Sequence, residues 1–273
     1  MSASGAQSAA PADQVMVRLA HVSKSFGPLR VLEDVSLDIF RGQTTVIIGP
    51  SGTGKSVLLK HIVGLLRPDR GEVHFERYRV DQLNQQQLVE VRKQIGFLFQ
   101  MGALFDSLTV EANIAFPLVE HTDLSARQRA ERVDRVLKMV GLAGLQSKMP
   151  ADLSGGQRKR VALARAIVLE PSLVLYDEPT TGLDPIRADV INELIIALSR
   201  QMGITSIAVT HDIASANKIA DRMVLLYDGH IVCEGDPASF ARTDNPLVRR
   251  FITGQADQDD LDRIREGFKG AQV

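Results

Sequence analysis

The sequence predicts an α/β fold built around a largely parallel sheet. Compact apolar runs flanked by turn-forming residues indicate buried strands; these runs are TTVIIG (44–49), IGFLFQ (95–100), SLVLYDEP (172–179) and SIAVTH (206–211). Helix-like stretches separate them, and strands that alternate with helices are typical of a parallel sheet covered by helices. At 273 residues, the chain is long enough for one large domain with a sizeable core.

The N-terminal part of the chain predicts further strands and one buried helix. VMVRLAHVSKSF (15–26) and VSLDI (35–39) both have strand-like patterns. SVLLKHIVGLL (56–66) is apolar on most sides, so we expect a buried helix there. The turn-forming cluster RPDRG (67–71) is expected to end this helix.

Between about residues 103 and 168 the pattern changes, and we expect a helical insertion in the α/β core. SARQRAERVDRVLKMVG (125–141) reads as a polar amphipathic helix. Ser125 and Gln128 are placed as a capping box at its start, and Gly141 is placed to end it. No further strand pattern begins before residue 173.

The C-terminal half predicts a long helix followed by a hairpin. Asp184 is expected to cap the helix, with Pro185 at its first position and Gly203 beyond its end. The expected apolar stripe of this helix consists of Ile186, Val190, Ile191, Leu194, Ile195 and Leu198. VLLYDGHIVCEG (224–235) predicts a hairpin that turns at Asp228 and Gly229.

Both ends of the chain differ from this central part. Residues 1–14 are small and polar, so we expect a disordered tail, and they lack the pattern of a signal peptide. Residues 241–273 form a C-terminal extension. A short amphipathic helix is expected within it, on Leu247, Val248, Phe251 and Ile252. Two interpretations stay open: the extension packs across a dimer, or this helix is a frayed surface element.

Composition excludes some classes of partner. Charged residues make up 24% of the chain and the net charge is −1, so bulk electrostatics predicts no attraction to nucleic acid. The single cysteine, Cys233, cannot form an internal disulfide, which fits a reducing compartment. No apolar stretch is long enough to cross a bilayer, so any work at a membrane needs a membrane-spanning partner.

GPSGTGKS (49–56) matches the P-loop pattern and lies between a predicted strand and a predicted helix. Its glycines let backbone N–H groups turn inward around phosphates. Lys55 can reach β- and γ-phosphate oxygens, and the Ser56 hydroxyl can ligate Mg²⁺. The predicted nucleotide-binding residues are Gly49, Pro50, Ser51, Gly52, Thr53, Gly54, Lys55 and Ser56.

Polar residues at the ends of three other predicted strands point to the same chemistry. Asp177 is carried to a strand end, where it can hold Mg²⁺ through water, and Glu178 can deprotonate an attacking water. Gln100 can orient that water and touch Mg²⁺, and His211 is placed for a γ-phosphate contact. The alternatives are an acidic turn at 177–179 and a purely structural histidine.

A second glycine-rich helix start occurs in LSGGQ (153–157), where Ser154, Gly155, Gly156 and Gln157 open a helical run. Such a start is a potential anion site. One nucleotide needs one phosphate cradle, so a second cradle has a use if it faces the nucleotide of another copy. The sequence therefore predicts a head-to-tail dimer with ATP between the copies, closed by the γ-phosphate.

GPSGTGKS, Gln100, LSGGQ, LVLYDEP, TGLDP and His211, in this order, resemble the ATP-binding subunits of ABC transporters over about residues 15–240. The resemblance implies ATPase activity with ATP and Mg²⁺. It also implies a P-loop NTPase core of the ABC ATPase type, with an antiparallel β subdomain and an inserted helical subdomain at about 103–168. In this family LSGGQ is the signature loop, Asp184 lies in a dimer-interface loop, and an aromatic ring covers adenine. That ring would be Phe26, unless Phe26 belongs to the core.

Three segments are similar to the ATPases of Mla/MCE-type lipid transport systems: residues 54–69, 99–122 and 245–254. This resemblance implies permease subunits, an MCE-domain lipid-binding protein and a peripheral position on the cytoplasmic face of the inner membrane. In the family, the segment after Gln100 docks the permease, although Leu104, Phe105 and Leu108 could equally be core. A transporter of another solute and a soluble ABC ATPase, such as an iron–sulfur assembly factor, remain alternatives; a small-molecule kinase has no use for LSGGQ.

Overall fold

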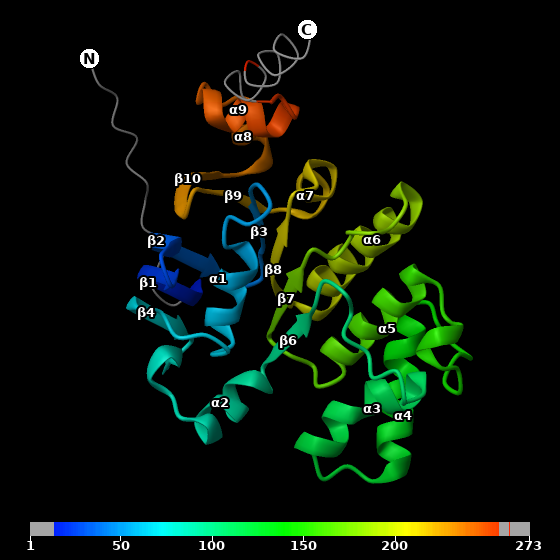
Figure 1. The fold of residues 1–273 in the computed structure, drawn as a ribbon. Coiled ribbons are helices and arrows are strands. Elements are labelled where there is room, and N and C mark those ends of the chain that lie inside the picture. The colour runs from blue at the N-terminus through cyan, green and yellow to red at the C-terminus, as the bar shows by residue number, and fades with distance from the viewer. Residues whose placement is uncertain (1–13, 257–261, 263–273) are drawn as a thin grey trace, which may run out of the picture.

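The structure is a computed structural model and describes residues 14–256 and residue 262. Its strands form two sheets (Figure 1). The larger has the order β10-β9-β3-β8-β7-β6 and consists of β3 (Thr44–Ile48), β6 (Ile95–Leu98), β7 (Leu173–Asp177), β8 (Thr205–Thr210), β9 (Arg222–Tyr227) and β10 (His230–Gly235). Neighbouring strands pair in parallel, except that β10 pairs antiparallel with β9. This confirms the predicted α/β fold with a largely parallel sheet.

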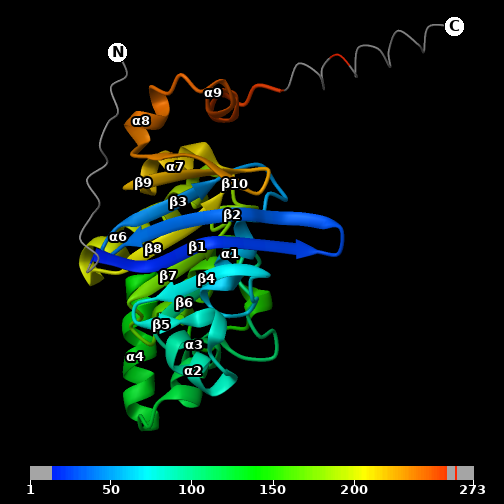
Figure 2. The ribbon, with the colours of Figure 1, turned by 90° about the vertical axis from the view of Figure 1, so that its left-hand side faces the viewer.

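The smaller sheet is antiparallel and has the order β2-β1-β4-β5. It consists of β1 (Val15–Phe26), β2 (Leu29–Phe40), β4 (Arg70–Phe75) and β5 (Tyr78–Arg79). The hairpin of β1 and β2 is long, and its turn extends beyond the larger sheet in Figure 2. This sheet is the antiparallel β subdomain that the sequence resemblance implies.

In Figure 1, α3, α4 and α5 lie near one end of the molecule and α8 and α9 at the other, while α1, α6 and α7 lie alongside the larger sheet. They are α1 (Lys55–Ile62), α2 (Gln85–Arg92), α3 (Val110–His121), α4 (Ala126–Met139), α5 (Gly155–Ile167), α6 (Pro185–Met202), α7 (Ile213–Ile219), α8 (Pro237–Ala241) and α9 (Pro246–Thr253), with 3-10 turns η2 (Val80–Gln82) and η3 (Pro150–Asp152). α3, α4 and α5 lie between β6 and β7 in the chain, in the segment where a helical insertion is predicted. The division of the chain into domains stays a prediction.

The larger sheet lies between two hydrophobic cores, because successive side chains of its buried strands point alternately into one core and the other. In β7, Leu173 and Leu175 pack with α1 and the smaller sheet, whereas Val174 and Tyr176 pack with the core that α3 to α9 share. Successive side chains of a strand point to opposite faces, so an apolar run without alternation is buried on both sides. The carboxyl ends of these parallel strands are left open for polar groups.

Several predicted local features are confirmed. Ser125 and Gln128 form the capping box of α4, and Asp184 caps α6 with Pro185 as the first helical residue. The β9–β10 hairpin turns at Asp228 and Gly229, whose φ angles are 47° and 77°. Two positive φ angles at a two-residue turn match the right-handed twist of the flanking strands.

The predicted helix at 56–66 is shorter than expected, because α1 ends at Ile62 rather than at RPDRG. Gly64 adopts φ 65°, the left-handed conformation that terminates helices. A Cβ at Gly64 would lie 2.5 Å from Cδ2 of Leu88, so a larger residue here would also displace that side chain of α2. The apolar Leu65 beyond this turn is 51% exposed.

The predicted apolar stripe of α6 is wrong at its first turns. Ile191, Ile195 and Leu198 are buried as expected, but Ile186 is 80% exposed and Val190 is 43% exposed. The start of α6 lies beside the start of α5, since a Cβ at Gly156 would lie 3.4 Å from Cδ of Arg187. These turns therefore belong to the surface near residues 154–157 rather than to the core.

The described parts of both termini pack on the fold. The carbonyl oxygen of Gln14 accepts a hydrogen bond from the backbone N–H of Arg41 (2.9 Å), so Gln14 continues the pairing of β1 with β2. The rest of the predicted tail lies outside the described residues. In α9, Val248 is buried in the core of this chain, and Leu247, Phe251 and Ile252 pack against it. Most of the extension beyond α9 lies outside the described residues. Within the described part of the chain, none of the helices combines the length and apolar character that a bilayer span requires.

Candidate functional site

The P-loop residues connect the end of β3 to the start of α1. Gly49, Gly52 and Gly54 have φ angles of 156°, 83° and 94°. A Cβ at Gly49 would lie 2.1 Å from the carbonyl oxygen of Leu226, which only glycine avoids. Gly54 caps α1 without a side-chain hydrogen bond, so the first N–H groups of the helix keep the capacity to bind an anion.

Lys55 lies inside this loop. Its Nζ donates to the carbonyl oxygens of Gly49 and Pro50, both at 2.7 Å, and its side chain is buried. Burial lowers the pKa of Lys55, whereas the nearby carboxylates of Glu178 and Asp177 act to raise it. An ammonium held by neutral carbonyls beside two carboxylates can exchange these contacts for phosphate oxygens.

Ser56 and Asp177 meet across the site. The Ser56 hydroxyl donates to Oδ1 of Asp177 at 2.6 Å, although the two residues come from α1 and β7. Burial raises the pKa of Asp177, and the hydrogen bond from Ser56 opposes this shift. A hydroxyl and a carboxylate are oxygen donors that fit Mg²⁺. The described residues hold no cluster of three or more His, Cys, Asp or Glu suited to a metal, so a cation here would take its other ligands from phosphate and water.

Glu178 follows Asp177 directly and is paired with His211. Its φ is 49°, unusual for a residue with a side chain, so the chain turns sharply after β7. The Nδ1 atom of His211 lies 3.1 Å from Oε1 and 3.0 Å from Oε2 of Glu178. Hydroxyls of Thr181 and Thr210 also donate to Oε2, at 3.0 and 3.3 Å. The pair forms because β7 and β8 are parallel neighbours that end at the same edge.

Sequence reasoning missed Lys159, which lies in the second turn of α5. It is only 7% exposed, and its Nζ donates to the main-chain oxygen of Glu178 at 3.0 Å. The signal was present, because Lys159 lies three and four positions before the apolar Ala162 and Leu163 and thus on the buried face of the helix. The flanking Arg158 and Arg160 obscured it as part of a basic run.

Two predicted site residues lie away from these contacts. Gln100 is exposed just after β6, and its side chain makes no hydrogen bond with a residue that the structure describes. Phe26 is 45% exposed at the end of β1, with Nζ of Lys24 5.6 Å from its ring centroid. The alternative that Phe26 belongs to the core is therefore wrong, and the ring is open to a ligand.

Within one chain, the glycine-rich starts of α1 and α5 do not come together in one site. Ser154 caps α5 and forms a capping box with Gln157, in which Oε1 of Gln157 accepts from the N–H of Ser154 at 2.8 Å. Figure 1 shows α5 well apart from α1. Asp184 lies nearby at the start of α6, where Oδ2 is 3.2 Å from Nε of Arg187. Residues 154–157 and Asp184 thus lie close together, at the starts of α5 and α6.

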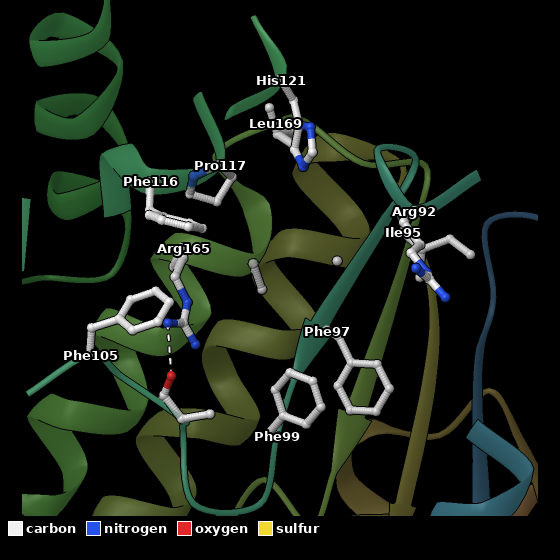
Figure 3. Close-up of a pocket in the computed structure, with 13 residues that line it drawn as sticks. Arg92, Ile95, Phe97, Phe99, Phe105, Phe116, Pro117, His121, Arg165 and Leu169 are labelled. Atoms are coloured by element: carbon white, nitrogen blue, oxygen red, sulfur yellow. Dashed lines mark hydrogen bonds between the residues drawn. The ribbon is translucent and has the colours of Figure 1, made fainter. Parts of the chain in front are cut away.

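A groove of about 330 Å³ lies between β6, α3 and α5 (Figure 3). Its aromatic lining forms two ring pairs, Phe97 with Phe99 and Phe105 with Phe116, whose centroids are 4.2 and 4.9 Å apart. Phe105 and Phe116 are 42% and 40% exposed, so the interpretation of Phe105 as core is wrong, whereas Leu104 does pack against the core.

Two arginines line the same groove, and Figure 3 shows the guanidinium of Arg92 pointing away from Phe105 and Phe116. Arg165 donates to the carbonyl oxygens of Gly102 (2.8 Å) and Ala103 (2.9 Å), and Arg92 donates to those of Val63 (3.0 Å) and Gly64 (3.1 Å). Neither forms an ion pair with a carboxylate of the described residues, and burial lowers the pKa of Arg165. The groove therefore combines exposed aromatic surface with positive charge that carbonyls solvate but do not neutralise.

Curated relatives match most of the chain. It is 41% identical over 242 residues to the "Intermembrane phospholipid transport system ATP-binding protein MlaF" of Escherichia coli K12, covering 89% of this chain and 90% of that protein. It is 42% identical over 241 residues to the "Probable ribonucleotide transport ATP-binding protein mkl" of Mycobacterium leprae, covering 88% and 70%. It is 41% identical over 260 residues to "Protein TRIGALACTOSYLDIACYLGLYCEROL 3, chloroplastic" of Arabidopsis thaliana, covering 89% and 75%.

Solved structures agree with these relatives. The dimeric structure of MJ0796, a bacterial ABC transporter cassette, superposes with a TM-score of 0.76 at 35% identity, covering 81% of this chain and 99% of that chain. A post-hydrolysis dimer of the same cassette with ADP and Pi gives a TM-score of 0.76 at 36% identity, with the same coverage. The family model described as ABC transporter matches residues 32–181. The chain belongs to the ABC transporter family, as an ATP-binding subunit with ATPase activity.

Proposed function

We propose that this chain is the ATP-hydrolysing motor of a membrane transporter that moves phospholipid or another lipid between membranes. The hydrolytic part rests on one observation. Ser56, Asp177 and Glu178 meet beside a P-loop whose helix start has no side-chain cap. A hydroxyl, two carboxylates and free N–H groups at one sheet edge suit phosphate transfer from a nucleotide to water.

In this proposal the P-loop and Lys55 hold the phosphates of ATP, and Phe26 covers the adenine ring. Mg²⁺ held by Ser56 and Asp177 would neutralise charge on the β- and γ-phosphates. Glu178 takes a proton from the attacking water, and His211 orients Glu178 and reaches the γ-phosphate. Gln100, exposed just after β6, is proposed to orient this water and to touch Mg²⁺.

We also infer that two copies sandwich two ATP molecules head to tail. Residues 154–157 form a glycine-rich helix start at which Ser154 is exposed, and Figure 1 shows its helix α5 apart from α1, which follows the P-loop of the same chain. The related cassette MJ0796 was solved as a dimer. In the proposed dimer, residues 154–157 of one copy contact the γ-phosphate held by the other, and Asp184 crosses the interface. Hydrolysis then removes a contact that closes the dimer.

The aromatic groove is the proposed docking site for the permease. Phe105 and Phe116 expose apolar surface, and Arg165, which lies 5.8 Å from the centroid of the Phe105 ring, adds positive charge that no carboxylate of the described chain pairs with. A short amphipathic helix that carries an acidic residue would cover the rings and neutralise a guanidinium. Through this contact the chain would be a peripheral subunit on the cytoplasmic face of the inner membrane.

Lipid is the proposed cargo because two relatives carry lipid names. MlaF is named for intermembrane phospholipid transport, and the Arabidopsis relative is named for a galactosylated diacylglycerol. The identity to MlaF extends over 90% of that protein, beyond the shared ATP-binding motifs. We therefore propose an MCE-domain lipid-binding protein as a further partner of the assembled transporter.

Another solute is the second candidate. The mycobacterial relative is named for ribonucleotide transport, at an identity as high as that of MlaF. Both candidates share the same ATPase chemistry and the same need for a permease. They differ only in the proteins and ligands bound on the membrane side.

A pull-down of the tagged chain from native membranes in mild detergent tests this proposal, with proteins and lipids identified by mass spectrometry. We expect a multi-span permease, an MCE-domain protein and phospholipid. A permease with a different solute-binding protein would replace lipid with another cargo. Soluble scaffold proteins without a permease would contradict the transporter and favour a soluble ABC ATPase.

A further inference from the structure

Lys159 is a buried charge that the proposed chemistry does not use. Its side chain is 7% exposed, and the hydrogen bond to the main-chain oxygen of Glu178 is the only one its ammonium makes with the described residues. Burial lowers the pKa of Lys159, and the carboxylates of Glu178 and Asp177 counteract this shift. An ammonium has three donors, so burying one with a single neutral acceptor among the described residues costs free energy.

The partner of Lys159 is the strained main chain of Glu178. That residue has a φ of 49°, and its N–H donates to the carbonyl oxygen of Val209 at 3.0 Å. Its own carbonyl accepts from Lys159 and, at 3.3 Å, from the N–H of Thr181. The peptide on the C-terminal side of Glu178 is therefore oriented partly by α5. Thr181, which follows this peptide, also donates its hydroxyl to Oε2 of Glu178 at 3.0 Å, so a rotation of the peptide would shift a contact that holds the carboxylate.

The helix that carries Lys159 also contacts the two surfaces proposed for partners. It begins at Ser154, in the loop proposed to meet the ATP of a second copy. Near its other end, Arg165 donates to the carbonyl oxygens of Gly102 and Ala103, in the loop between Gln100 and the aromatic groove. One continuous helix thus links a proposed nucleotide contact, the main chain of Glu178 and the proposed permease groove.

We propose that Lys159 is a positioning residue for the hydrolytic step. Because Lys159 binds the Glu178 carbonyl, the orientation of the Glu178 carboxylate depends on the position of α5. It therefore depends on the contacts made at both ends of that helix. This inference rests on the proposed role of Glu178 as the base.

Lys159→Met tests it, because methionine keeps the unbranched chain but has neither charge nor donor. We expect kcat for ATP to fall about 10–100-fold, as is usual when a group that orients a functional residue is lost. KM is expected to change less than about twofold, because Lys159 does not contact the substrate. Lys159→Gln keeps a donor and is expected to recover part of the loss. Lys138→Met, on the exposed face of α4, is the matched control with unchanged kcat.

Two further measurements separate positioning from a structural role. Replacing a buried charge by an apolar side chain of similar size is commonly neutral or stabilising, so the melting temperature of Lys159→Met is expected to be unchanged or higher. In the Glu178→Gln background, Lys159→Met is expected to have no further effect on the residual rate, because it acts through Glu178.

The outcomes are distinct. An unchanged kcat in Lys159→Met overturns the inference, and so does an equal fold-loss with or without Glu178. A lower melting temperature that accounts for the lost activity also overturns it. Failure of the proposed hydrolytic role would look different, because Glu178→Gln alone would then keep the parental turnover.

Discussion

At the residue scale, the site depends on acidic groups that are costly to bury without a cation. Burial raises the pKa of Asp177. Below the unfolded pKa of about 4, both states bind the proton, and stability from this group is fully present. As the pH rises through the higher folded pKa, the unfolded chain releases its proton more readily, so this contribution to stability is lost. The free chain is therefore less stable at neutral pH than its packing alone would make it.

Asp177→Asn is expected to raise the melting temperature of the nucleotide-free protein at pH 7, because it removes the buried charge. The difference from the parental chain is expected to shrink toward pH 4, which thermal unfolding across this range measures. The same variant is expected to need about 10–100-fold more Mg²⁺ for ATP turnover. A lower melting temperature at pH 7 would show that the Asp177 charge stabilises the free chain, contrary to this account.

Residues whose roles depend on local spacing could be predicted from the sequence. The P-loop glycines, Lys55 and Ser56 lie within eight consecutive positions, GPSGTGKS, and one turn places them all. Asp177 and Glu178 follow a buried strand, so their position at the sheet edge was also predictable. The burial of Lys159 could be predicted from its helical position, but its contact could not, because its partner is a main-chain oxygen 19 positions away and main-chain acceptors leave no trace in a sequence.

At the element scale, α6 shows why a periodic pattern alone does not identify a core. Ile186, Val190 and Ile191 fall on one predicted stripe, yet only Ile191 is buried. Helical spacing identifies an apolar face but does not say what covers it. Since Ile186 lies close to Asp184 and to the start of α5, we expect it to be covered by the second copy in the ATP-bound dimer.

Ile186→Asp is therefore expected to weaken the ATP-dependent dimer of the Glu178→Gln variant by about 10–100-fold, from the loss of roughly 1.5–3 kcal/mol of side-chain burial. Its melting temperature is expected to stay close to the parental value, because the side chain is exposed in the free chain. Val119→Asp, which alters an exposed residue on α3, is the control. The dimer affinities of Glu178→Gln with and without Ile186→Asp are measured by analytical ultracentrifugation. Equal affinities would show that Ile186 does not lie in the interface.

At the scale of the whole molecule, the two ends of the larger sheet carry different elements. One end carries α3, α4 and α5 with the aromatic groove, and the other carries α8 and α9 beyond β9 and β10 (Figures 1 and 2). The sequence predicted this order of elements well, because strand and helix patterns are local. The shape of the groove was not predictable, since its lining comes from three stretches of the chain, residues 92–105, 116–121 and 165–169, that meet only in the fold.

Phe116→Asp is expected to abolish co-purification of the permease, because it places a charge among the exposed rings and opposes an acidic partner. ATP turnover of the isolated chain is expected to be unchanged, since the groove does not contact the P-loop. Met139→Asp, at the end of α4, is the control and should keep the permease bound. If Phe116→Asp still retains the permease in the same pull-down, the docking site lies elsewhere on the chain.

The central claim is that ATP joins two copies of this chain and that Glu178 then hydrolyses it. The most direct measurement is the mass in solution of Glu178→Gln with ATP and Mg²⁺, together with its rate of turnover. We expect a stable particle of twice the 29.9 kDa chain mass, with turnover about 10²–10⁴-fold below parental. Lys55→Ala, which should not bind nucleotide, is expected to stay monomeric. A Glu178→Gln protein that remains monomeric with ATP and hydrolyses it at the parental rate would contradict the account.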